Sequence, residues 1–260
     1  MAVVQGVDVL GAEHGPLFLV VGVFDGLHLG HAYLLDRLVA EARGRSSRPA
    51  VITFDHHPDE ILTGAAPPLL CDPAERLERL EAAGVEVTVV QHFDQALRMT
   101  PFDTFVRRIA ARAPVAGFLM TPDAAFGHER RGTPDAVARL GESMNFDVVV
   151  VPALVLDRQP VRSAEIRSAI AGGEVDVAAR LLGRPYAVVG EGTAESGGVT
   201  RLTFRMPVAL PPAGLHAAIV TLGDGAEVRG DVRVDDDGSI RVWVTPDASS
   251  KVSRLRVTFV

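Results

Sequence analysis

The sequence predicts an α/β chain in which a doubly wound parallel sheet is followed by a small antiparallel β-barrel or sandwich. Two features of the 260-residue chain carry this prediction. Up to residue 182, apolar runs of strand length alternate with amphipathic runs at helical spacing, as in βαβ units around a parallel sheet. From residue 186 helical periodicity stops and glycine, threonine and valine become frequent. We therefore expect one domain over residues 1–185 and a second over residues 186–260.

The elements of the first domain are predicted from hydrophobic periodicity. Residues 1–15 hold two short apolar pairs and are expected to form a loose edge segment. The apolar run Leu17–Val23 suits a strand buried on both faces of a parallel sheet, and Ala32–Arg43 has the spacing of an amphipathic helix. Further strands are expected at 50–54, 85–90, 115–120 and 146–151, and helices at 73–83, 102–112, 134–144, 163–171 and 175–182.

The second domain contains runs that alternate in the manner of antiparallel strands. The expected strands are 201–204, 216–222, 226–234, 240–244 and 252–260. Gly223-Asp224-Gly225 and the Asp-Asp-Asp-Gly segment at 235–238 are turn signals between them.

Composition excludes several classes of protein. The chain is 47% hydrophobic, yet it has no apolar run long enough for a membrane span and no basic and apolar leader at its start. A net charge of −7 argues against a general nucleic-acid surface. Cys71 is the only cysteine, which excludes an internal disulfide and leads us to expect a cytoplasmic protein. Lys251 is the only lysine, and nothing indicates the oligomeric state.

The junction of the first strand and first helix carries the strongest chemical signal. His28-Leu29-Gly30-His31 stands at the start of the helix, and a helix N-terminus attracts phosphate through its unpaired N–H groups. His28 and His31 are three residues apart, so both rings can point to one side and hydrogen-bond the phosphates of a nucleotide. Glycines let a nucleotide approach the backbone without Cβ clashes. They are Gly22, Gly26 and Gly30.

The string GVFDGLHLGHAYLL, residues 22–35, resembles the signature of the HxGH nucleotidyltransferase superfamily. More narrowly, it resembles the adenylyltransferase module of prokaryotic FAD synthetases, the bifunctional riboflavin kinase/FMN adenylyltransferases. This resemblance covers most of residues 17–186. It implies a Rossmann-like sheet, ATP and FMN as substrates, and Mg²⁺ on the phosphates. It also implies a nucleotide site lined by Gly22, Phe24, Asp25 and Gly30.

The segment TFDHHP, residues 53–58, resembles the TFDPHP motif of that family. The resemblance places Phe54, His57 and Pro58 near the flavin phosphate. His56 stands where the family usually has proline. Adjacent histidines seldom share one metal ion, and no further cysteine or aspartate cluster has ligand spacing. We therefore assign no metal-ligating residue.

The segment Asp123-Ala124-Ala125-Phe126-Gly127, followed by Gly132, resembles the DFxFG…G loop of the family. Taken alone, these residues favour an ordinary turn after a strand. The resemblance makes Asp123 a candidate substrate contact and Phe126 a candidate wall for the isoalloxazine ring. Ala124 replaces an aromatic residue of the pattern.

Residues 161–167, VRSAEIR, align with the family pattern ISSTxIR. In that pattern the hydroxyl groups and the final arginine hold the ATP phosphates at a helix start. Ser163 and Arg167 match, whereas Arg162 replaces the first serine and Ala164 replaces the threonine. Losing one hydroxyl-to-phosphate hydrogen bond costs about 1–3 kcal/mol. The alternative interpretation is a capped helix with a surface arginine.

The segment Gly183-Arg184-Pro185-Tyr186 resembles the junction between the two modules of the family. A riboflavin kinase module then requires a glycine-rich segment and the motif GFPTAN. Residues 190–198 can supply the glycine-rich part, but the following stretch at 202–207 reads LTFRMP. We therefore expect a reduced relic without riboflavin kinase activity, kept for a structural or partner role.

The resemblance implies an FMN adenylyltransferase that converts ATP and FMN into FAD and pyrophosphate. The phosphate of FMN would attack the α-phosphorus of ATP in line, with Mg²⁺ bridging the phosphates. His28 and His31 would stabilise the developing charge, and Ser163 and Arg167 would hold the β- and γ-phosphates.

Two alternatives stay open. The first is the same chemistry on another phosphorylated acceptor, because His56, Ala124 and Ala164 fall where the resemblance places substrate contacts. The second is a catalytically silent flavin- or nucleotide-binding homologue, which the altered serine-threonine pattern favours and the retained histidine pair opposes.

Overall fold

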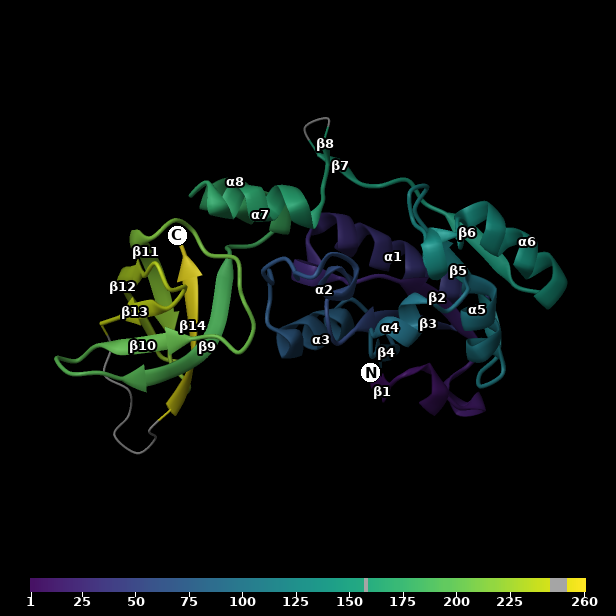
Figure 1. The fold of residues 1–260 in the computed structure, drawn as a ribbon, viewed down its shortest axis with the longest axis horizontal. Helices are drawn as coiled ribbons and strands as arrows, with labels where there is room; N and C mark the ends of the chain where they lie inside the picture. Colours follow the sequence, from purple (N-terminus) through teal and green to yellow (C-terminus); the bar gives the residue numbers. More distant parts are fainter. Residues whose placement is uncertain (157–158, 244–251) are drawn as a thin grey trace. The chain divides into compact units, whose positions relative to one another are not determined.

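The computed structural model describes residues 1–156, 159–243 and 252–260, with the backbone alone for residues 252 and 253. The chain forms two compact units (Figure 1). The first unit comprises residues 1–67 and 73–160, and the second comprises residues 68–72 and 161–260. The predicted fold class is confirmed, because the first unit contains a six-stranded parallel sheet and the second a closed antiparallel barrel.

The sheet of the first unit has the strand order β1-β4-β3-β2-β5-β6. Its strands are β1 (Ala2–Gln5), β2 (Leu17–Val21), β3 (Arg48–Phe54), β4 (Val87–Gln91), β5 (Val115–Met120) and β6 (Asp147–Val150). The segment before residue 15 lies at the edge of the sheet as expected, but it is not loose, because β1 pairs in parallel with β4. This edge strand needs little burial, and Val4 alone of its residues is buried.

Helices cover both faces of this sheet. They are α1 (Leu29–Gly44), α2 (Pro58–Thr63), α3 (Pro73–Ala82), α4 (Gln95–Arg98), α5 (Phe102–Ala110) and α6 (Pro134–Met144). Successive side chains of a strand point to opposite faces, so Phe18 of β2 packs in one core with α1 and α3. Leu19 packs in the other core with α5 and α6. The short 3-10 turns are η1 (Val7–Val9), η2 (Ala12–His14), η3 (Asp25–Leu27) and η4 (His128–Arg130).

The strand order creates a switch point between β2 and β5. From β2 the chain proceeds outwards to β3 and β4, whereas β5 is followed by β6 on the other side. In open α/β sheets, ligands bind in the crevice outside the carboxyl ends of the strands at such a point. The turn after β2 therefore lies where a ligand is expected.

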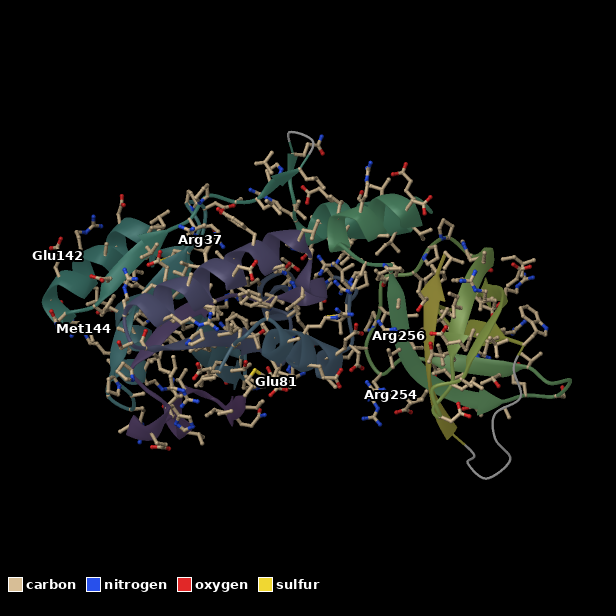
Figure 2. All side chains as sticks on the ribbon, turned by 180° about the vertical axis from the view of Figure 1, so that it is seen from behind. Arg37, Glu81, Glu142, Met144, Arg254 and Arg256 are labelled. Atoms are coloured by element: carbon tan, nitrogen blue, oxygen red, sulfur yellow. The ribbon has the colours of Figure 1, made fainter. Side chains whose placement is uncertain are left out.

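The barrel of the second unit closes in the order β10-β13-β12-β11-β14-β9. Its strands are β9 (Ala187–Ala194), β10 (Thr200–Thr203), β11 (Gly214–Thr221), β12 (Glu227–Val234), β13 (Ile240–Val242) and β14 (Val252–Phe259). Strand β9 was not predicted. The last residue of the expected strand 240–244 lies outside the described residues, and so does Lys251. On β14, Leu255 and Val257 are buried, while Arg254 and Arg256 alternate with them towards the outside (Figure 2).

Two helices share the hydrophobic core of the barrel. They are α7 (Ser163–Ala171) and α8 (Val175–Leu182). Ile166 and Ile170 of α7 pack in one buried cluster with barrel residues, and Leu70 of the segment 68–72 joins the same cluster. The remaining strands, β7 (Val155–Leu156) and β8 (Gln159–Pro160), form a small ladder in the first unit. No helix among the described residues is long and apolar enough to cross a membrane.

Candidate functional site

The turn between β2 and α1 has an unusual backbone. Phe24 and Leu27 adopt positive φ angles of 54° and 36°, and Gly26 has φ 76°. Non-glycine residues in this region cost free energy unless the surroundings hold them. Here the surroundings do so, because Phe24, Asp25 and Leu27 are buried and α3 packs against the turn. The turn therefore fixes the position at which α1 begins.

The histidine pair lies at the first turn of α1. His28 is the N-cap residue, and its Nδ1 accepts a hydrogen bond of 3.3 Å from the backbone N–H of His31. The two imidazole rings are stacked with centroids 3.7 Å apart, and the ring of Phe24 lies 5.0 Å from that of His31. Because Nδ1 of His28 is an acceptor here, Nε2 carries the proton in the neutral ring.

The protonation state of His31 follows from its surroundings. Burial and, to a smaller extent, the neighbouring His28 lower the pKa of His31 well below its ordinary value. Its Nδ1 is buried and has no hydrogen-bond partner among the described residues. His31 is therefore neutral at pH 7, and it can act on a phosphate as an N–H donor rather than as a preformed cation.

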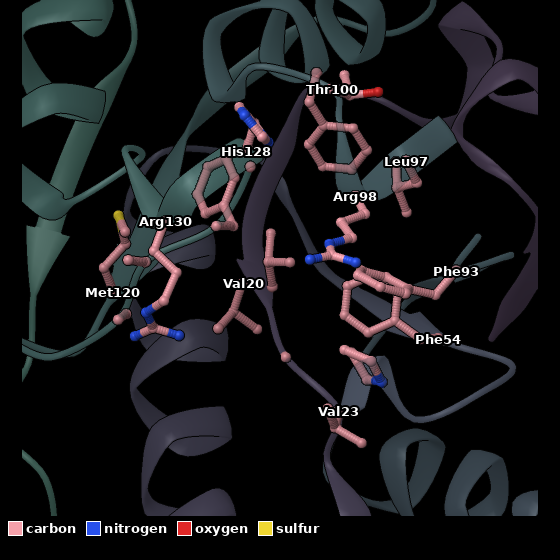
Figure 3. Close-up of a pocket in the computed structure, with 18 of the residues that line it drawn as sticks. Val20, Val23, Phe54, Phe93, Leu97, Arg98, Thr100, Met120, His128 and Arg130 are labelled. Carbon is pink, nitrogen blue, oxygen red and sulfur yellow. The ribbon is translucent and has the colours of Figure 1, made fainter. Parts of the chain in front are cut away.

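A cavity of about 670 Å³ opens at the switch point of the sheet (Figure 3). This volume is in the range of small-molecule sites. The carboxyl ends of β2 and β5 form its floor through residues 20–23 and 118–121. Leu34, three residues after His31 on α1, also lines it. Gly22 lines the cavity too, and a Cβ at that position would lie 3.1 Å from the ring of Phe24.

Aromatic and cationic side chains line this cavity together. Phe54 and Phe93 meet edge to face with centroids 5.3 Å apart, at the ends of β3 and β4. Arg98 donates a hydrogen bond of 3.3 Å to the carbonyl oxygen of Ile61. Figure 3 shows Arg98 beside the two rings. An apolar wall with a few charged groups suits a flat aromatic ligand that carries an anionic group.

The motif after β3 continues into a short helix. His57 caps α2, and its Nδ1 accepts a hydrogen bond of 3.2 Å from the backbone N–H of Asp59. Pro58 occupies the first position of α2, where its missing N–H costs nothing. Both residues line the cavity.

The loop after β5 folds back on itself. Backbone hydrogen bonds join Phe126 and Gly132 in both directions, at 3.4 and 3.0 Å. Gly127 has φ 75°, and a Cβ there would lie 2.6 Å from the backbone of Phe102, so only glycine fits. The loop presents Phe126 to the cavity, with its ring 6.1 Å from that of Phe118. Arg130 of this loop donates a hydrogen bond of 3.1 Å to the carbonyl oxygen of Asp123.

Arg76 of α3 supports the two strand ends beneath the site. Its guanidinium donates hydrogen bonds to the carbonyl oxygens of Val23, at 3.2 Å, and Phe54, at 2.9 Å. The hydroxyl of Thr53 donates a further hydrogen bond of 2.9 Å to Val23. Arg76 is 7% exposed. These contacts tie the turn after β2 to the motif after β3.

The predicted site residues fall into three groups. Those that line the cavity are Gly22, Phe54, His57, Pro58 and Phe126. Those outside the cavity lining, at the turn, the helix start and the loop after β5, are Phe24, Asp25, His28, Gly30, His31 and Asp123. The third group belongs to α7 in the second unit: Ser163 is its first residue and Arg167 lies one turn further on. Nε of Arg167 donates a hydrogen bond of 2.8 Å to the carbonyl oxygen of Pro68. The assigned roles stay predictions.

Sequence reasoning missed most of the residues that line the cavity. Among them are Phe93, Arg98, His128 and Arg130. Phe93 could have been found, because it follows a predicted strand just as Phe54 does. Arg98 could not, because α4 is a single turn with little periodicity. His128 and Arg130 stand between the two glycines of a recognised loop, which was a usable signal.

Comparison with known proteins identifies the family. The model of the FAD synthetase family matches residues 11–165. The bifunctional riboflavin kinase/FMN adenylyltransferase of Pseudomonas fluorescens is 31% identical over 191 residues, 73% of this chain and 61% of that protein. Its Haemophilus influenzae counterpart is 32% identical over 174 residues, 66% of this chain and 56% of that protein. The chain thus spans about three fifths of the length of these relatives. It belongs to the FAD synthetase family.

A solved structure shows the same fold over nearly the whole chain. The crystal structure of a macrolide-efflux protein from Streptococcus pneumoniae superposes with a TM-score of 0.82 at 21% identity. The match covers 99% of this chain and 88% of that one. At this identity the likeness concerns the fold alone.

Proposed function

We propose that this protein is an FMN adenylyltransferase, which transfers AMP from ATP to FMN and releases pyrophosphate. One observation carries the proposal: the stacked histidine pair at the start of α1 directly follows the turn after β2, and the carboxyl end of β2 lines an aromatic cavity at the switch point of the sheet. Family membership and the names of the curated relatives support it.

The histidine pair acts on the nucleotide. Nε2–H of His28 and the ring of neutral His31 donate hydrogen bonds to phosphate oxygens, and the N-terminus of α1 adds its unpaired N–H groups. The donors are held in place before the reaction, so they stabilise charge as it develops on the α-phosphate. No covalent intermediate is required, because phosphoryl-type transfer depends mainly on positioning and electrostatics.

The cavity holds the acceptor. The isoalloxazine ring packs against Phe126 and the pair Phe54 and Phe93, and the phosphate of FMN lies by His57 and Pro58. Arg98 supplies positive charge at the same wall. In this proposal the FMN phosphate faces ATP bound at the start of α1 and attacks the α-phosphorus in line, with pyrophosphate as the leaving group.

Magnesium enters with the nucleotide in this proposal. Mg²⁺ prefers oxygen ligands and is commonly held by substrate phosphates together with one or two carboxylates. The one group of three candidate metal ligands found among the described residues contains two histidines, which do not suit Mg²⁺. When bound, Mg²⁺ offsets the charge of the triphosphate.

The second unit takes the role of a reduced riboflavin-kinase-like domain without kinase activity. The sequence at 202–207 replaces the PTAN element, although a closed barrel is present. The family resemblance sets the boundary between the two modules near residue 185, although α7 and α8 pack in the core of the second unit. By the same resemblance, Ser163 and Arg167 of α7 are assigned to the β- and γ-phosphates. The same proposal includes a cytoplasmic location, which suits the lone, buried Cys71.

Incubating the purified full chain with ATP, Mg²⁺ and FMN tests the proposal, with FAD followed by chromatography. Formation of FAD is expected, and its absence where a control FAD synthetase makes it would rule the proposal out. Riboflavin with ATP is expected to give no FMN, and measurable kinase turnover would refute the loss of that activity.

A second candidate function is the same transfer to another phosphorylated acceptor. Ala124 lines the cavity where the family pattern has an aromatic residue, so a contact that the pattern implies for the acceptor is missing there. A panel of phosphate monoesters offered with ATP distinguishes the two: faster pyrophosphate release with another acceptor than with FMN favours this candidate. Tight binding of FMN or ATP with no pyrophosphate release from any acceptor indicates instead a catalytically silent homologue.

A further inference from the structure

Asp55, His56 and His92 come together at the rim of the sheet, and we call them the Asp55 cluster. Asp55 and His56 follow β3, whereas His92 follows β4. The two strands are adjacent and parallel, with Phe54 opposite Gln91, so the residues that follow them meet. A backbone hydrogen bond of 3.2 Å from Asp55 to Gln91 continues the pairing beyond the strand ends.

Within the Asp55 cluster, both imidazole rings contact the carboxylate of Asp55. Nδ1 of His92 lies 2.7 Å from Oδ2 of Asp55, and Nδ1 of His56 lies 3.1 Å from Oδ1 of the same carboxylate. The two rings are 5.7 Å apart and nearly perpendicular, at 85°. A ligand atom from each residue lies within 4.8 Å of the others. The two imidazole nitrogens thus flank one carboxylate, each beside a different oxygen.

The geometry points to a binding site for a late first-row divalent cation such as Zn²⁺, with Asp55, His56 and His92 as its three protein ligands. Zinc bound at 2.0–2.2 Å in a tetrahedron places neighbouring ligand atoms about 3.3 Å apart. The observed spacings of 2.7 and 3.1 Å run to different oxygens of Asp55, and all the candidate ligand atoms lie within 4.8 Å of one another, so the rings must turn until both nitrogens face one ion. The side chains of His56 and His92 are 47% and 63% exposed, so both rings can adjust.

The carboxylate is held in place by the backbone. The N–H groups of His56 and Phe93 donate hydrogen bonds to Oδ1 of Asp55, at 2.7 and 3.2 Å. Such outer contacts orient a metal ligand and keep its site formed before the ion arrives.

The ligand set selects the class of ion. Two imidazoles and one carboxylate suit Zn²⁺, Co²⁺ or Ni²⁺, whereas Mg²⁺ and Ca²⁺ require mostly oxygen ligands. Three protein ligands leave a position for water. Phe54 and Phe93, next in sequence to Asp55 and His92, line the cavity. A bound ion therefore joins the ends of β3 and β4 beside that cavity.

The competing account is a simple ion pair. The hydrogen bond with Asp55, followed by the charge of Asp55 and that of Asp94, raises the pKa of His92. A protonated His92 would satisfy the carboxylate without any metal ion. The two accounts differ in one respect, because the ion pair predicts no binding of zinc in the micromolar range.

Metal titration of the untagged full chain tests the site. The probes are Zn²⁺ in equilibrium dialysis and Co²⁺ followed by its visible absorption, both at pH 7.5, with Mg²⁺ as the comparison ion. We expect one equivalent of Zn²⁺ to bind, and Co²⁺ to give the intense absorption of a four-coordinate ion. Excess Mg²⁺ is expected not to displace either ion.

Substitutions in the Asp55 cluster test whether zinc binds there. His92→Ala, Asp55→Asn and His56→Ala each remove one ligand, and each is expected to weaken zinc binding by more than the roughly 10–100-fold that loss of an outer-shell partner costs. His14→Ala and His216→Ala remove histidines outside the cluster and are expected to leave the affinity unchanged. Circular dichroism checks that each variant is folded.

Two results would contradict the proposed zinc site. One is the absence of micromolar zinc binding in the unaltered chain. The other is a zinc stoichiometry and affinity that persist in folded His92→Ala and His56→Ala proteins. Neither result depends on FAD synthesis, so the test stands apart from the proposed adenylyltransferase activity.

Discussion

His28 has two separable tasks at the start of α1. It caps the helix through Nδ1, and it is a candidate donor to phosphate through Nε2. Asparagine is among the best N-cap residues, whereas alanine is poor. The two substitutions therefore distinguish the structural task from the chemical one.

We predict that His28→Asn keeps the N-cap hydrogen bond and loses adenylyl transfer by about 10²–10³-fold, the cost of one preorganised donor. His28→Ala is expected to lose the activity and, in addition, about 1 kcal/mol of unfolding free energy. Urea unfolding and initial rates of FAD formation measure both. An active His28→Asn protein would contradict the assignment.

The depressed pKa of His31 makes stability depend on pH. The unfolded chain takes up a proton near the ordinary value of 6.5, whereas folded His31 does so only at a lower pH. Between those two pKa values the unfolded state binds more protons, so the free energy of unfolding falls as the pH falls. The contribution of His31 is complete above pH 6.5 and is lost below it.

We predict that replacing His31 by glutamine removes this pH dependence. Urea unfolding of both proteins at pH 7.5 and at pH 5 measures it, and the difference between them isolates His31 from other titrating groups such as His92. The unaltered protein is expected to lose more stability on acidification than His31→Gln. Equal losses would show that folded His31 titrates normally.

At the scale of elements, the loop after β5 depends on one glycine. Gly127 and Gly64 have similar φ angles of +75° and +84°, but only Gly127 has backbone atoms where a Cβ would lie. An alanine at either position carries the cost of a left-handed conformation, about 1–2 kcal/mol. At Gly127 a clash with Phe102 is added.

We predict that Gly127→Ala destabilises the protein more than Gly64→Ala and raises KM for FMN, because the displaced loop carries Phe126. Thermal unfolding and FMN-dependent rates check this. Gly64→Ala serves as the matched control, since its Cβ would meet nothing within 4 Å. Similar stability and KM in the two variants would mean that the loop adjusts freely.

Local patterns predicted some elements to the residue and missed others. Strand β5 and helix α6 have the predicted bounds 115–120 and 134–144, because each is defined by its own periodicity and flanking residues. Strand β9 was missed because its sequence, AVVGEGTA, is rich in glycine. It is a strand because β10 and β14 pair with it on both sides, a tertiary effect that overrides local propensity.

Parts of the site could not be predicted from the sequence, because they too depend on contacts between residues distant in the chain. The sequence placed His28 and His31 together because they are neighbours on one helix. The contacts of Arg76 with Val23 and Phe54 span 53 and 22 residues. The meeting of His92 with Asp55 spans 37 residues and depends on the register of β3 against β4. No single-sequence pattern contains that register.

At the scale of the whole molecule, the second unit includes a segment distant in sequence. Residues 68–72 join it through Leu70, which is 2% exposed in the core of α7, α8 and the barrel. Leu69 also pairs with Val208 in an isolated bridge. The stability of the second unit therefore depends on residues inserted within the first.

We predict that Leu70→Ala lowers the unfolding free energy of the second unit by about 2–5 kcal/mol, the usual cost of a buried Leu→Ala change. Trp243, the only tryptophan of the chain, lies in that unit and reports its unfolding by fluorescence. Leu215 is 63% exposed, and Leu215→Ala is expected to change the unfolding free energy of the second unit by less than about 0.5 kcal/mol. Equal midpoints for the two variants would contradict the role of Leu70.

The central claim is that the histidine pair and the aromatic cavity serve AMP transfer to FMN. In the most direct test, ATP labelled with ³²P at the α-phosphate is incubated with Mg²⁺, FMN and the full chain, and the products that carry the label are identified. The label is expected to appear in FAD, with unlabelled pyrophosphate released and with little transfer by His28→Asn. Label that stays in ATP, or transfer that is unchanged in His28→Asn, would contradict the account.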